Sequence, residues 1–434
     1  MANVDIKIKD NDSAMDLTYA SKDPAKPAAS VNPGKTEKIK LFVCFIQTHI
    51  GGAMTSLVNF LNALDTDKYE VDVMFYENGS GREGIKPEIN ILPQGKIHAK
   101  YSISNILRKF CSPRYVLAAA HGTYLRRVKR NKRQAAQVMS KQGCRYSAAN
   151  DKEYDIAIAY EFGWCLNYVM TRIKAKEKIS WHHLDYANSE LCYKFDKKSF
   201  DKADALVFVS EDIRRAYIND HPEHAAKSYF IPNILSSEYV RKRGGAEDVS
   251  LPFEDGDKYL KLLTVARINF SHKGLDRAVE AFARLKSDGL TDNVKWVIIG
   301  KGRDEERLRE LISRRGLKDV VYPIGVRENP IPYMKKFDAM LLPSRYEGKP
   351  MVVTEGFIMG LVPIVTRYTS AGEQIQNGVD GLIFENNDEA LYQGLKTVLE
   401  DPKALDRMRE YINKHDYGNE KEIEKFDKLA EGLL

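Results

Sequence analysis

The sequence predicts an α/β protein with two Rossmann-like domains, each built on a parallel β-sheet. Short, nearly continuous apolar runs alternate with amphipathic stretches, a pattern typical of buried parallel strands joined by helices. The alternation stops in a polar segment, residues 236–257, and then begins again. A chain of 434 residues is also too long for one hydrophobic core. Because ligands bind at the carboxyl ends of parallel strands, we expect the functional site in a cleft between the two sheets.

The first domain is expected over residues 38–235 and the second over residues 258–415, with residues 236–257 as a linker. Strands of the first domain are predicted at residues 40–46, 71–75, 155–160 and 205–209, with a helix at 54–64. Strands of the second domain are predicted at residues 261–266, 294–300, 320–325, 339–344, 362–366 and 381–384. Helices between them are predicted near residues 275–287, 303–315, 329–337 and 388–400. Residues 1–37 are polar and aperiodic, which predicts a disordered tail.

The composition is that of a globular protein, with 43% hydrophobic residues. Its five scattered cysteines form no CxxC pair, which argues against a disulfide framework and for a reducing compartment. No run approaches the roughly 18 apolar residues of a membrane-spanning helix. The first residues, MANVDIKIKDNDSAMD, lack the apolar core of a signal peptide. We therefore expect a cytoplasmic protein.

The segment SRYEGKPMVVTEGF, residues 344–357, carries two glutamates eight positions apart. Its Gly-Lys-Pro favours a helix start, so the first amides, those of Met351 and Val352, would lack partners within the helix and could bind a phosphate. Glu347 and Glu355 would then accept hydrogen bonds from hydroxyls that flank the phosphate. A nucleotide diphosphate sugar offers this arrangement. The alternative, in which Glu347 caps the helix and Glu355 is solvated, stays open on this segment alone.

Three further loops follow predicted strands. VARINFSHKG contains Arg267 and Lys273, two cations that could stabilise a departing diphosphate, although ordinary surface cations would look the same. THIGGAMTSL opens a helix with Gly51 and Gly52, which allow the backbone to approach a ligand closely. The Gly-Lys-Gly at residues 300–302 lacks a third glycine, which disfavours a dinucleotide cofactor.

The segment ISWHHLDYAN, residues 179–188, supplies His182, His183 and Asp185 after another apolar run. These side chains could be metal ligands, but no further His, Cys or Asp cluster completes a set of three or four at recognisable spacing. We therefore expect no metal. A histidine packed in a loop at the end of a sheet is the alternative interpretation.

Positive charge is concentrated in one window. Residues 101–145 contain eleven Lys or Arg and no Asp or Glu, whereas the net charge of the chain is +6. Within this window, residues 105–138 mix cations with apolar and aromatic residues, as in helices that bind anionic membranes. A solvated charged face is the alternative, and no nucleic acid is expected because no module that binds one is recognisable. The cations expected at the membrane or acceptor are Arg126, Arg127, Lys129, Arg130, Lys132 and Arg133.

Together these segments resemble the retaining glycosyltransferases of family 4, which have the GT-B fold, over residues from about 39 to 415. Glu347 and Glu355 match the E-x7-E element of that family, and VARINFSHKG matches its R-x5-K-G spacing. WHHLDY is similar to a W-x-H-x-D-Y segment of members that build bacterial surface polysaccharides, and this alignment selects His183. The final helix of such proteins crosses back to the first domain, which implies the same for residues 416–434.

The resemblance also implies roles for residues of this chain. Glu347 would bind hydroxyls of the donor sugar, Glu355 would hold the ribose, and His183 would contact the sugar. Arg267 and Lys273 would stabilise the departing diphosphate. No metal and no other cofactor would be needed. The other implied donor contacts are Gly51 and Gly52 at the diphosphate, Gly325 and Val326 at the base, and Gly348, Met351 and Val352.

We therefore expect an enzyme that transfers a hexose or N-acetylhexosamine, with a UDP-sugar as the favoured donor, to a hydroxyl of a lipid-linked or polymeric glycan at the inner face of the membrane. The anomeric configuration would be retained, and the leaving phosphate would take the acceptor's proton. In an inverting reaction, Asp185 or His183 would be the candidate base. Two other classes stay open: a sugar-nucleotide epimerase with the GT-B fold, and a non-catalytic protein that binds membranes or nucleic acid through its basic segment.

Overall fold

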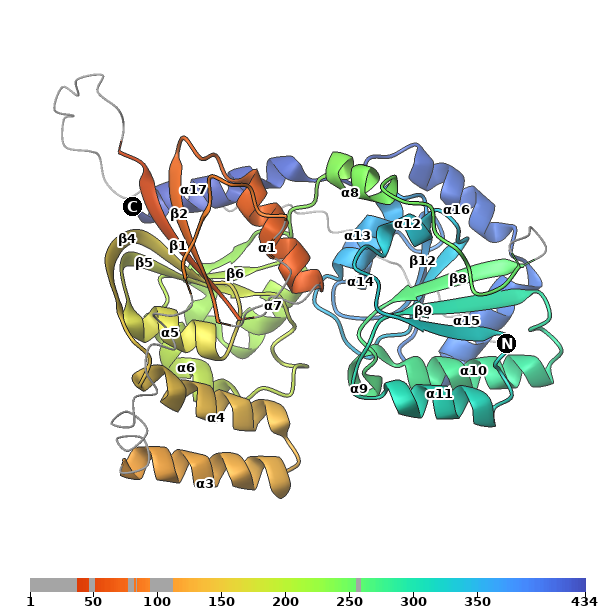
Figure 1. The fold of residues 1–434 in the computed structure, drawn as a ribbon, viewed down its shortest axis with the longest axis horizontal. Helices are drawn as coiled ribbons and strands as arrows, with labels where there is room; N and C mark the ends of the chain where they lie inside the picture. The colour runs from red at the N-terminus through yellow and green to blue at the C-terminus, as the bar shows by residue number, and fades with distance from the viewer. Residues whose placement is uncertain (1–36, 47–50, 77–81, 83, 94–111, 255–258) are drawn as a thin grey trace, which may run out of the picture. The chain divides into compact units, whose positions relative to one another are not determined.

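The structure of the protein is a computed structural model (Figure 1). It describes residues 37–46, 51–76, 82, 84–93, 112–254 and 259–434. The predicted N-terminal tail lies outside the described residues except for Glu37. Residues 105–111 of the basic segment lie outside them as well, and so do residues 47–50 of the glycine-containing loop.

Within the described residues, the first sheet has seven parallel strands. They are β1 (Ile39–Phe45), β2 (Tyr69–Phe75), β3 (Asn90–Ile91), β4 (Asn150–Ala159), β5 (Ile173–His182), β6 (Ala205–Phe208) and β7 (Ser228–Phe230). Across the sheet they follow the order β3-β2-β1-β4-β5-β6-β7. β1 therefore pairs with both β2 and β4, and the direction of the strand order reverses at this point.

The second sheet has six parallel strands and repeats this arrangement. They are β8 (Leu260–Val265), β9 (Val294–Ile299), β10 (Val321–Gly325), β11 (Ala339–Leu342), β12 (Val362–Thr366) and β13 (Leu382–Phe384). Their order is β10-β9-β8-β11-β12-β13, so it reverses between β8 and β11. The prediction of two α/β domains with parallel sheets is confirmed. Since ligands of such sheets bind where the order reverses, the topology points to the carboxyl ends of β8 and β11.

Helices cover both sheets. In the first domain they are α1 (Gly52–Ala63), α3 (Pro113–Arg127), α4 (Lys132–Arg145), α5 (Trp164–Arg172), α6 (Tyr193–Lys202) and α7 (Glu211–Asp220), and α8 (Ser237–Gly244) follows β7. Later helices are α9 (Phe270–Lys273), α10 (Leu275–Ser287), α11 (Glu305–Arg314), α12 (Ile331–Met334), α13 (Met351–Ile358), α14 (Ala371–Gln374), α15 (Asp388–Glu400), α16 (Ala404–Asn413) and α17 (Ile423–Leu433). α5 contacts β4 and β5, α4 contacts α5, and α3 contacts α4, so α3 is the outermost of these layers (Figure 1).

The polar segment 236–257 is not a simple linker, because α8 occupies its first part. The hydroxyl of Ser236 caps α8 by accepting a hydrogen bond from a first-turn amide at 3.2 Å. The buried positions of the helix are Ser237, Val240 and Gly244, and Val240 belongs to the core of the second sheet. Two of these three residues are small or polar, so the apolar periodicity that would reveal a helix is absent from the sequence.

The basic segment forms two helices within the described residues. α3 ends at Arg127, and α4 begins at Lys132. Between them Arg130 has a φ of 53°, a left-handed conformation that a continuous helix does not contain. The side chain of Asn131 then caps α4 by accepting from a backbone amide at 2.8 Å. The segment is therefore a helical hairpin, which was not predicted.

The last helix, α17, packs against the first sheet. Phe426 is fully buried, and its ring centroid lies 5.0 Å from that of Phe60 on α1 and 6.2 Å from that of Trp181 on β5. At the edge of this contact, the hydroxyl of Tyr69 donates to the carboxylate of Asp427 at 2.6 Å. The helix that follows the second domain in sequence thus belongs to the core of the first.

The two segments that connect the domains are hydrogen bonded to each other. The amide of Asn419 donates to the carbonyl of Leu235 at 3.0 Å, and the amide of Leu235 donates to the side-chain oxygen of Asn419 at 2.7 Å. The side-chain amide of Asn419 also donates to the carbonyl of Asn233 at 2.9 Å. Because one segment follows β7 and the other follows α16, both connections are joined at one place.

We expect Phe426→Ala to destabilise the first domain by about 3–5 kcal/mol, because it leaves a cavity among large buried rings. Urea unfolding followed by tryptophan fluorescence is suited to this measurement, since Trp181 lies beside the cavity. Leu434→Ala is the control, because Leu434 is 52% exposed and its change should stay within about 0.5 kcal/mol. Equal unfolding midpoints for the two variants would show that α17 does not stabilise this core.

Candidate functional site

Two loops meet at the carboxyl ends of the central strands β8 and β11. One leads from β8 to α10 and contains Lys273, and the other leads from β11 to α13 and contains Glu347. Because β8 and β11 pair in parallel, both loops leave the same edge of the sheet. The ammonium of Lys273 donates to Glu347 Oε1 at 2.5 Å, and the hydroxyl of Ser344 donates to the same oxygen at 2.5 Å. The topology therefore brings together two residues that lie 74 positions apart in the sequence.

The carboxylate of Glu347 is ionised although it is only 5% exposed. Burial raises its pKa, but Lys273 and His272 outweigh burial and lower the pKa to about 2. His272 Nε2 lies 3.5 Å from Glu347 Oε2, and its ring stacks on that of Tyr346 with centroids 4.2 Å apart. Burial lowers the pKa of His272 below its usual 6.5, so the imidazole is neutral at pH 7. The charge partner of Glu347 is therefore Lys273.

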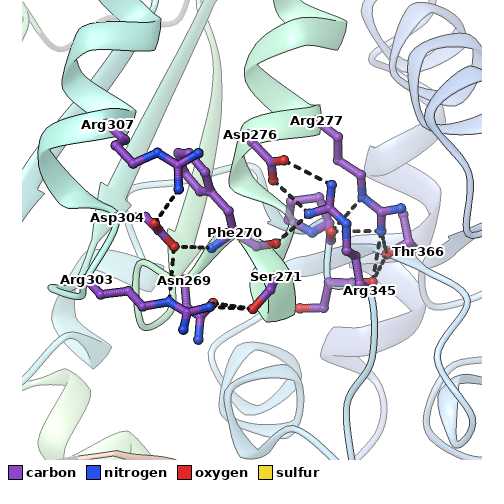
Figure 2. A network of polar contacts seen from close by, with 12 residues as sticks. Asn269, Phe270, Ser271, Asp276, Arg277, Arg303, Asp304, Arg307, Arg345 and Thr366 are labelled. Carbon is purple, nitrogen blue, oxygen red and sulfur yellow. Dashed lines mark hydrogen bonds and ion pairs between the residues drawn. The ribbon is translucent and has the colours of Figure 1, made fainter. Parts of the chain in front are cut away.

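A buried arginine on α10 holds the loop that carries Glu347 (Figure 2). Arg277 is 5% exposed, and its guanidinium donates to the carbonyls of Pro343 and Ser344 at 2.8 and 2.9 Å. It also donates to the hydroxyl of Thr366 on β12 at 3.0 Å, and this hydroxyl donates to the carbonyl of Ser344 at 2.6 Å. Burial and the neighbouring Arg345 lower the pKa of Arg277 to about 10, so it remains charged at pH 7.

Arg277 was not predicted from the sequence, although a signal existed. Its neighbours Leu275, Ala278 and Phe282 form the apolar face of α10, and all are buried. A cation beside such a face must find acceptors, because a buried charge without partners is very costly. An arginine three residues after the Lys-Gly element could therefore have been predicted to bind backbone carbonyls.

Further contacts fix the first loop against the second (Figure 2). The guanidinium of Arg345 forms a two-pronged ion pair with Asp276 at 2.7 and 3.0 Å and also donates to the carbonyl of Phe270. The amide of Phe270 donates in turn to Asp304 at 2.9 Å. Gly274 has a φ of 61°, and a Cβ there would lie 2.1 Å from the carbonyl oxygen of Pro343. The close approach of the two loops thus requires glycine directly after Lys273.

The loop after β11 ends at the helix α13. Pro350 is the residue before the first helical position, Met351, so the helix begins at the Gly-Lys-Pro as predicted. The amides of Met351 and Val352 lie in the first turn, where backbone donors lack partners within the helix. Glu355 lies one turn further, is 8% exposed, and has its pKa raised by burial to about 7. The two glutamates of this segment therefore differ in protonation at neutral pH.

Residues of the first domain contact the same loop. A Cβ on Gly348 would lie 2.0 Å from the carbonyl oxygen of His183, and a Cβ on Gly52 would lie 4.0 Å from Cγ of Met351. Gly51 precedes α1, whose first residue is Gly52. The structure therefore brings Gly52 and the segment after β5 against residues 348–351.

The two neighbouring histidines after β5 lie in different surroundings. The ring of His182 is fully buried, 4.4 Å from that of Phe208 between ring centroids, and burial lowers its pKa well below 6.5. His183 lies beyond it, 4.5 Å from the ring of Tyr160, and burial lowers its pKa to about 4. Asp185 accepts hydrogen bonds from the side chains of Asn188 at 2.7 Å and Thr369 at 2.6 Å. Of the two histidines, His183 is the one placed beside Gly348.

Arg267, Gly325 and Val326 lie at the same edge of the second sheet. Arg267 is exposed and follows β8. Gly325 ends β10 with a φ of 78°, and its carbonyl accepts from the amide of Gly300 at 2.9 Å. Val326 is 54% exposed. Their shared role with Glu347 stays a prediction.

The six predicted cations of the basic segment do not share one environment. Arg126, Arg127, Lys129, Arg130 and Lys132 are exposed. Arg133 is half-buried, donates to the carbonyl of Ser189 at 2.6 Å, and lies 5.6 Å from the ring centroid of Tyr346. It therefore faces the loops of the candidate site, and its place at the membrane or the acceptor stays a prediction.

No three His, Cys, Asp or Glu side chains gather as possible metal ligands in the part of the chain that the structure describes. Across the same residues, no helix has the length and apolar character needed to cross a membrane.

Comparisons with known proteins bear on this site. Residues 251–415, which contain both loops, match the family model described as "Glycosyl transferases group 1". The N-acetylgalactosamine-N,N'-diacetylbacillosaminyl-diphospho-undecaprenol 4-alpha-N-acetylgalactosaminyltransferase of Campylobacter jejuni is 29% identical over 208 residues, which is 47% of this chain and 53% of that protein. The putative colanic acid biosynthesis glycosyltransferase WcaL of Salmonella typhimurium is 33% identical over 143 residues, 30% of this chain and 34% of the relative. The matched segments thus cover about half, or less, of the length of these relatives.

Solved structures resemble the whole described fold. Anabaena HepE in complex with UDP and glucose superimposes with a TM-score of 0.61 at 16% identity, covering 91% of this chain and 99% of that one. Sucrose-phosphate synthase from Thermosynechococcus elongatus gives a TM-score of 0.62 at 15% identity, with the same coverage. These likenesses establish the fold, which is the GT-B arrangement of two Rossmann-like domains.

We expect Arg277→Lys to destabilise the second domain by about 1–3 kcal/mol, because a lysine cannot reproduce the forked contacts to two carbonyls and would leave a buried acceptor without a donor. Hydrogen exchange should show faster exchange of the amides in residues 343–350, and thermal unfolding should show a lower midpoint. Arg284→Lys is the matched control, since Arg284 lies on the same helix and pairs with Glu389 at the surface. If Arg277→Lys behaved like this control, the loop would be held by other contacts.

Proposed function

We propose that this protein is a glycosyltransferase that moves a sugar from a nucleotide diphosphate sugar to the hydroxyl of an acceptor. The observation that carries the proposal is the Lys273–Glu347 pair beside the first turn of α13, at the point where the strand order reverses. This arrangement offers a cation and helix amides to a diphosphate and a carboxylate to sugar hydroxyls. The family model and the glycosyltransferases among the relatives support the same activity.

The donor is expected to lie across the loops of the second domain. An ammonium has three donors, so Lys273 can bind Glu347 and a phosphate oxygen at the same time. The amides of Met351 and Val352 bind the phosphate with Arg267 as a further cation, and Glu347 accepts from hydroxyls of the sugar. Glu355, with its pKa near 7, accepts from the ribose. Gly51, Gly52 and Gly348 permit the close approach of the backbone to the diphosphate, and residues 325–326 meet the base.

We infer that the reaction retains the anomeric configuration. The bond between the anomeric carbon and the diphosphate oxygen breaks, the acceptor oxygen bonds to the same face of that carbon, and the acceptor proton passes to the leaving phosphate oxygen. Lys273 and the amides of α13 stabilise the charge of the leaving group. The environment of the alternative bases supports this mechanism. His183 has a pKa of about 4, so it is a weak base, and the carboxylate of Asp185 is already bound by Asn188 and Thr369.

The donor is proposed to be a UDP-sugar that carries a hexose or N-acetylhexosamine. HepE, which shares the fold, was solved with UDP and glucose. The acceptor is proposed to be a lipid-linked or polymeric glycan, because the C. jejuni relative is named for a diphospho-undecaprenol substrate and WcaL for colanic acid biosynthesis. No metal is proposed to take part.

A peripheral membrane contact through α3 fits such an acceptor. Leu117, Tyr124 and Val128 are 69%, 46% and 65% exposed and follow one face of the helix at intervals of seven and four residues. An adjacent face of the helix, with Ala118 and Leu125, is buried. Exposed cations at residues 126–130 flank the apolar stripe, so α3 matches a helix lying on an anionic surface at the cytoplasmic side.

We expect the wild-type protein to transfer sugar from one of the UDP-, GDP- or ADP-sugars to an acceptor glycan, and Glu347→Gln to lower the turnover by about 100- to 1,000-fold. Donor binding, measured by calorimetry, should persist in this variant because the diphosphate contacts remain. Glu389→Gln, an exposed ion-pair partner, is the control with unchanged turnover. A β-linked product from an α-linked donor would contradict retention, and conversion of the donor without any acceptor would indicate an epimerase.

We expect replacement of Arg126, Arg127, Lys129 and Arg130 by Gln to weaken binding to vesicles with anionic lipid by about fivefold per residue, since each cation contributes about 1 kcal/mol near such a surface. Sedimentation with phosphatidylglycerol vesicles measures this, with phosphatidylcholine vesicles for comparison. Arg314→Gln with Lys318→Gln, two exposed cations of the second domain, should leave vesicle binding unchanged. If both sets of variants bound the anionic vesicles equally well, α3 would not be the membrane contact.

A further inference from the structure

A cavity of about 290 Å³ lies in the first domain beside Asp185. It is formed by the segment that follows β5 and by the helix α7 with the residue after it. Buried rings of Tyr186 and Tyr217 line it together with the half-buried rings of Tyr193 and His221. This volume is near the lower end of the range of small-molecule sites, which suits a single small ring.

The hydroxyl groups of Tyr186 and Tyr217 are already bound within the protein, so what these side chains add to the lining is largely aromatic. The hydroxyl of Tyr186 donates to Asp196 at 2.9 Å, and that of Tyr217 is bound to His224 at 2.9 Å. The rings of Tyr193 and His221 stack, with centroids 3.6 Å apart and planes inclined by 15°. The electron-rich face of an aromatic ring attracts the polarised C–H groups of a saturated ring. A sugar presents such C–H groups on one face and hydroxyls at its edge.

The charged groups of the cavity are carboxylates. Asp185 and Asp220 line it, and among its described lining residues there is no Lys or Arg. Asp185 is held in one orientation by Asn188 and Thr369, whereas Asp220 is exposed. Burial lowers the pKa of His221, so its ring is neutral at pH 7. Carboxylates accept hydrogen bonds from hydroxyls and repel anions. The cavity therefore suits a ligand with hydroxyl groups and disfavours one that carries an acid group.

The cavity is connected with the candidate site through Asp185. This residue lies two positions after His183, whose carbonyl contacts Gly348. Thr369, which donates to Asp185, belongs to the second domain. The cavity itself is lined by residues of the first domain, whereas the proposed donor loops belong to the second. A glycan that reaches the sugar donor from this side would pass Asp185.

We propose that this cavity, the Tyr193–His221 pocket, binds an uncharged sugar unit of the acceptor other than the unit that carries the reacting hydroxyl. The proposal rests on the proposed function, because it takes the bound glycan to be the acceptor of that reaction. It makes the enzyme selective for acceptors with a neutral unit at this position over acceptors with a uronic acid there.

The pocket is tested with methyl α-glucoside and methyl α-galactoside and with the matching glucuronide and galacturonide, which differ only in the carboxylate. Saturation-transfer NMR is recorded with saturating UDP, so that the donor site is occupied. We expect a neutral glycoside to bind the wild-type protein and the uronides not to bind. Tyr193→Ala should weaken the binding of the neutral glycoside by about tenfold. Tyr229→Ala, at an exposed tyrosine of β7, should leave the binding of the neutral glycoside unchanged.

Asp220→Lys is a second variant. Because Asp220 is exposed, we expect this substitution to leave the fold intact. It should allow the uronides to bind, because it replaces a repelling charge with an attracting one. Binding of a uronide to the wild-type protein as tight as that of its neutral partner would overturn the proposal. Equal binding of the neutral glycoside to wild type and Tyr193→Ala, or no binding to either, would overturn it as well. Calorimetry with UDP on each variant reports on the donor site separately, so a loss of the pocket and a failure of the proposed function are distinguished.

Discussion

The geometry of the candidate site depends on one buried guanidinium, that of Arg277. A cation removed from water needs strong acceptors, and here the acceptors are the carbonyls at the end of β11 and the hydroxyl of Thr366. These contacts fix backbone atoms rather than a mobile side chain, so the course of the loop is set before it reaches Glu347. α10, β11 and β12 are joined through this one group, and Glu347 is presented from a rigid support.

The pKa values of Glu347, in the loop before α13, and Glu355, on α13, are shifted in opposite directions. The pKa of Glu347 falls to about 2, so its ion pair adds stability that is present above pH 4.5 and is lost as the pH falls toward 2. The pKa of Glu355 rises to about 7, so its burial removes stability as the pH rises from 4.5 to 7. A hydroxyl that donated to this carboxylate would favour its ionised form and lower its pKa.

Much of this arrangement could be predicted from the sequence because parallel sheets impose strong patterns. The apolar runs located the central strands, and the loops that follow two of these strands contain Lys273 and Glu347. Contacts that depend on packing could not be predicted in the same way. α8 buries Ser237 and Gly244, which give no apolar signal in the sequence. The basic segment is interrupted at Arg130, which has a left-handed conformation, and Arg133 beyond it lies near the ring of Tyr346. The separation of His182 from His183 follows from the end of β5, which spacing alone does not give.

The connections between the two domains have a consequence for motion. The chain passes from one domain to the other twice, and Asn419 and Leu235 hydrogen bond the two passages to each other. One connecting segment would let the domains rotate freely about it. Two connecting segments that are hydrogen bonded to each other permit bending about one axis and oppose rotation about the others. Any relative motion of the domains would therefore be hinge-like, because the two connecting segments cannot move independently of each other.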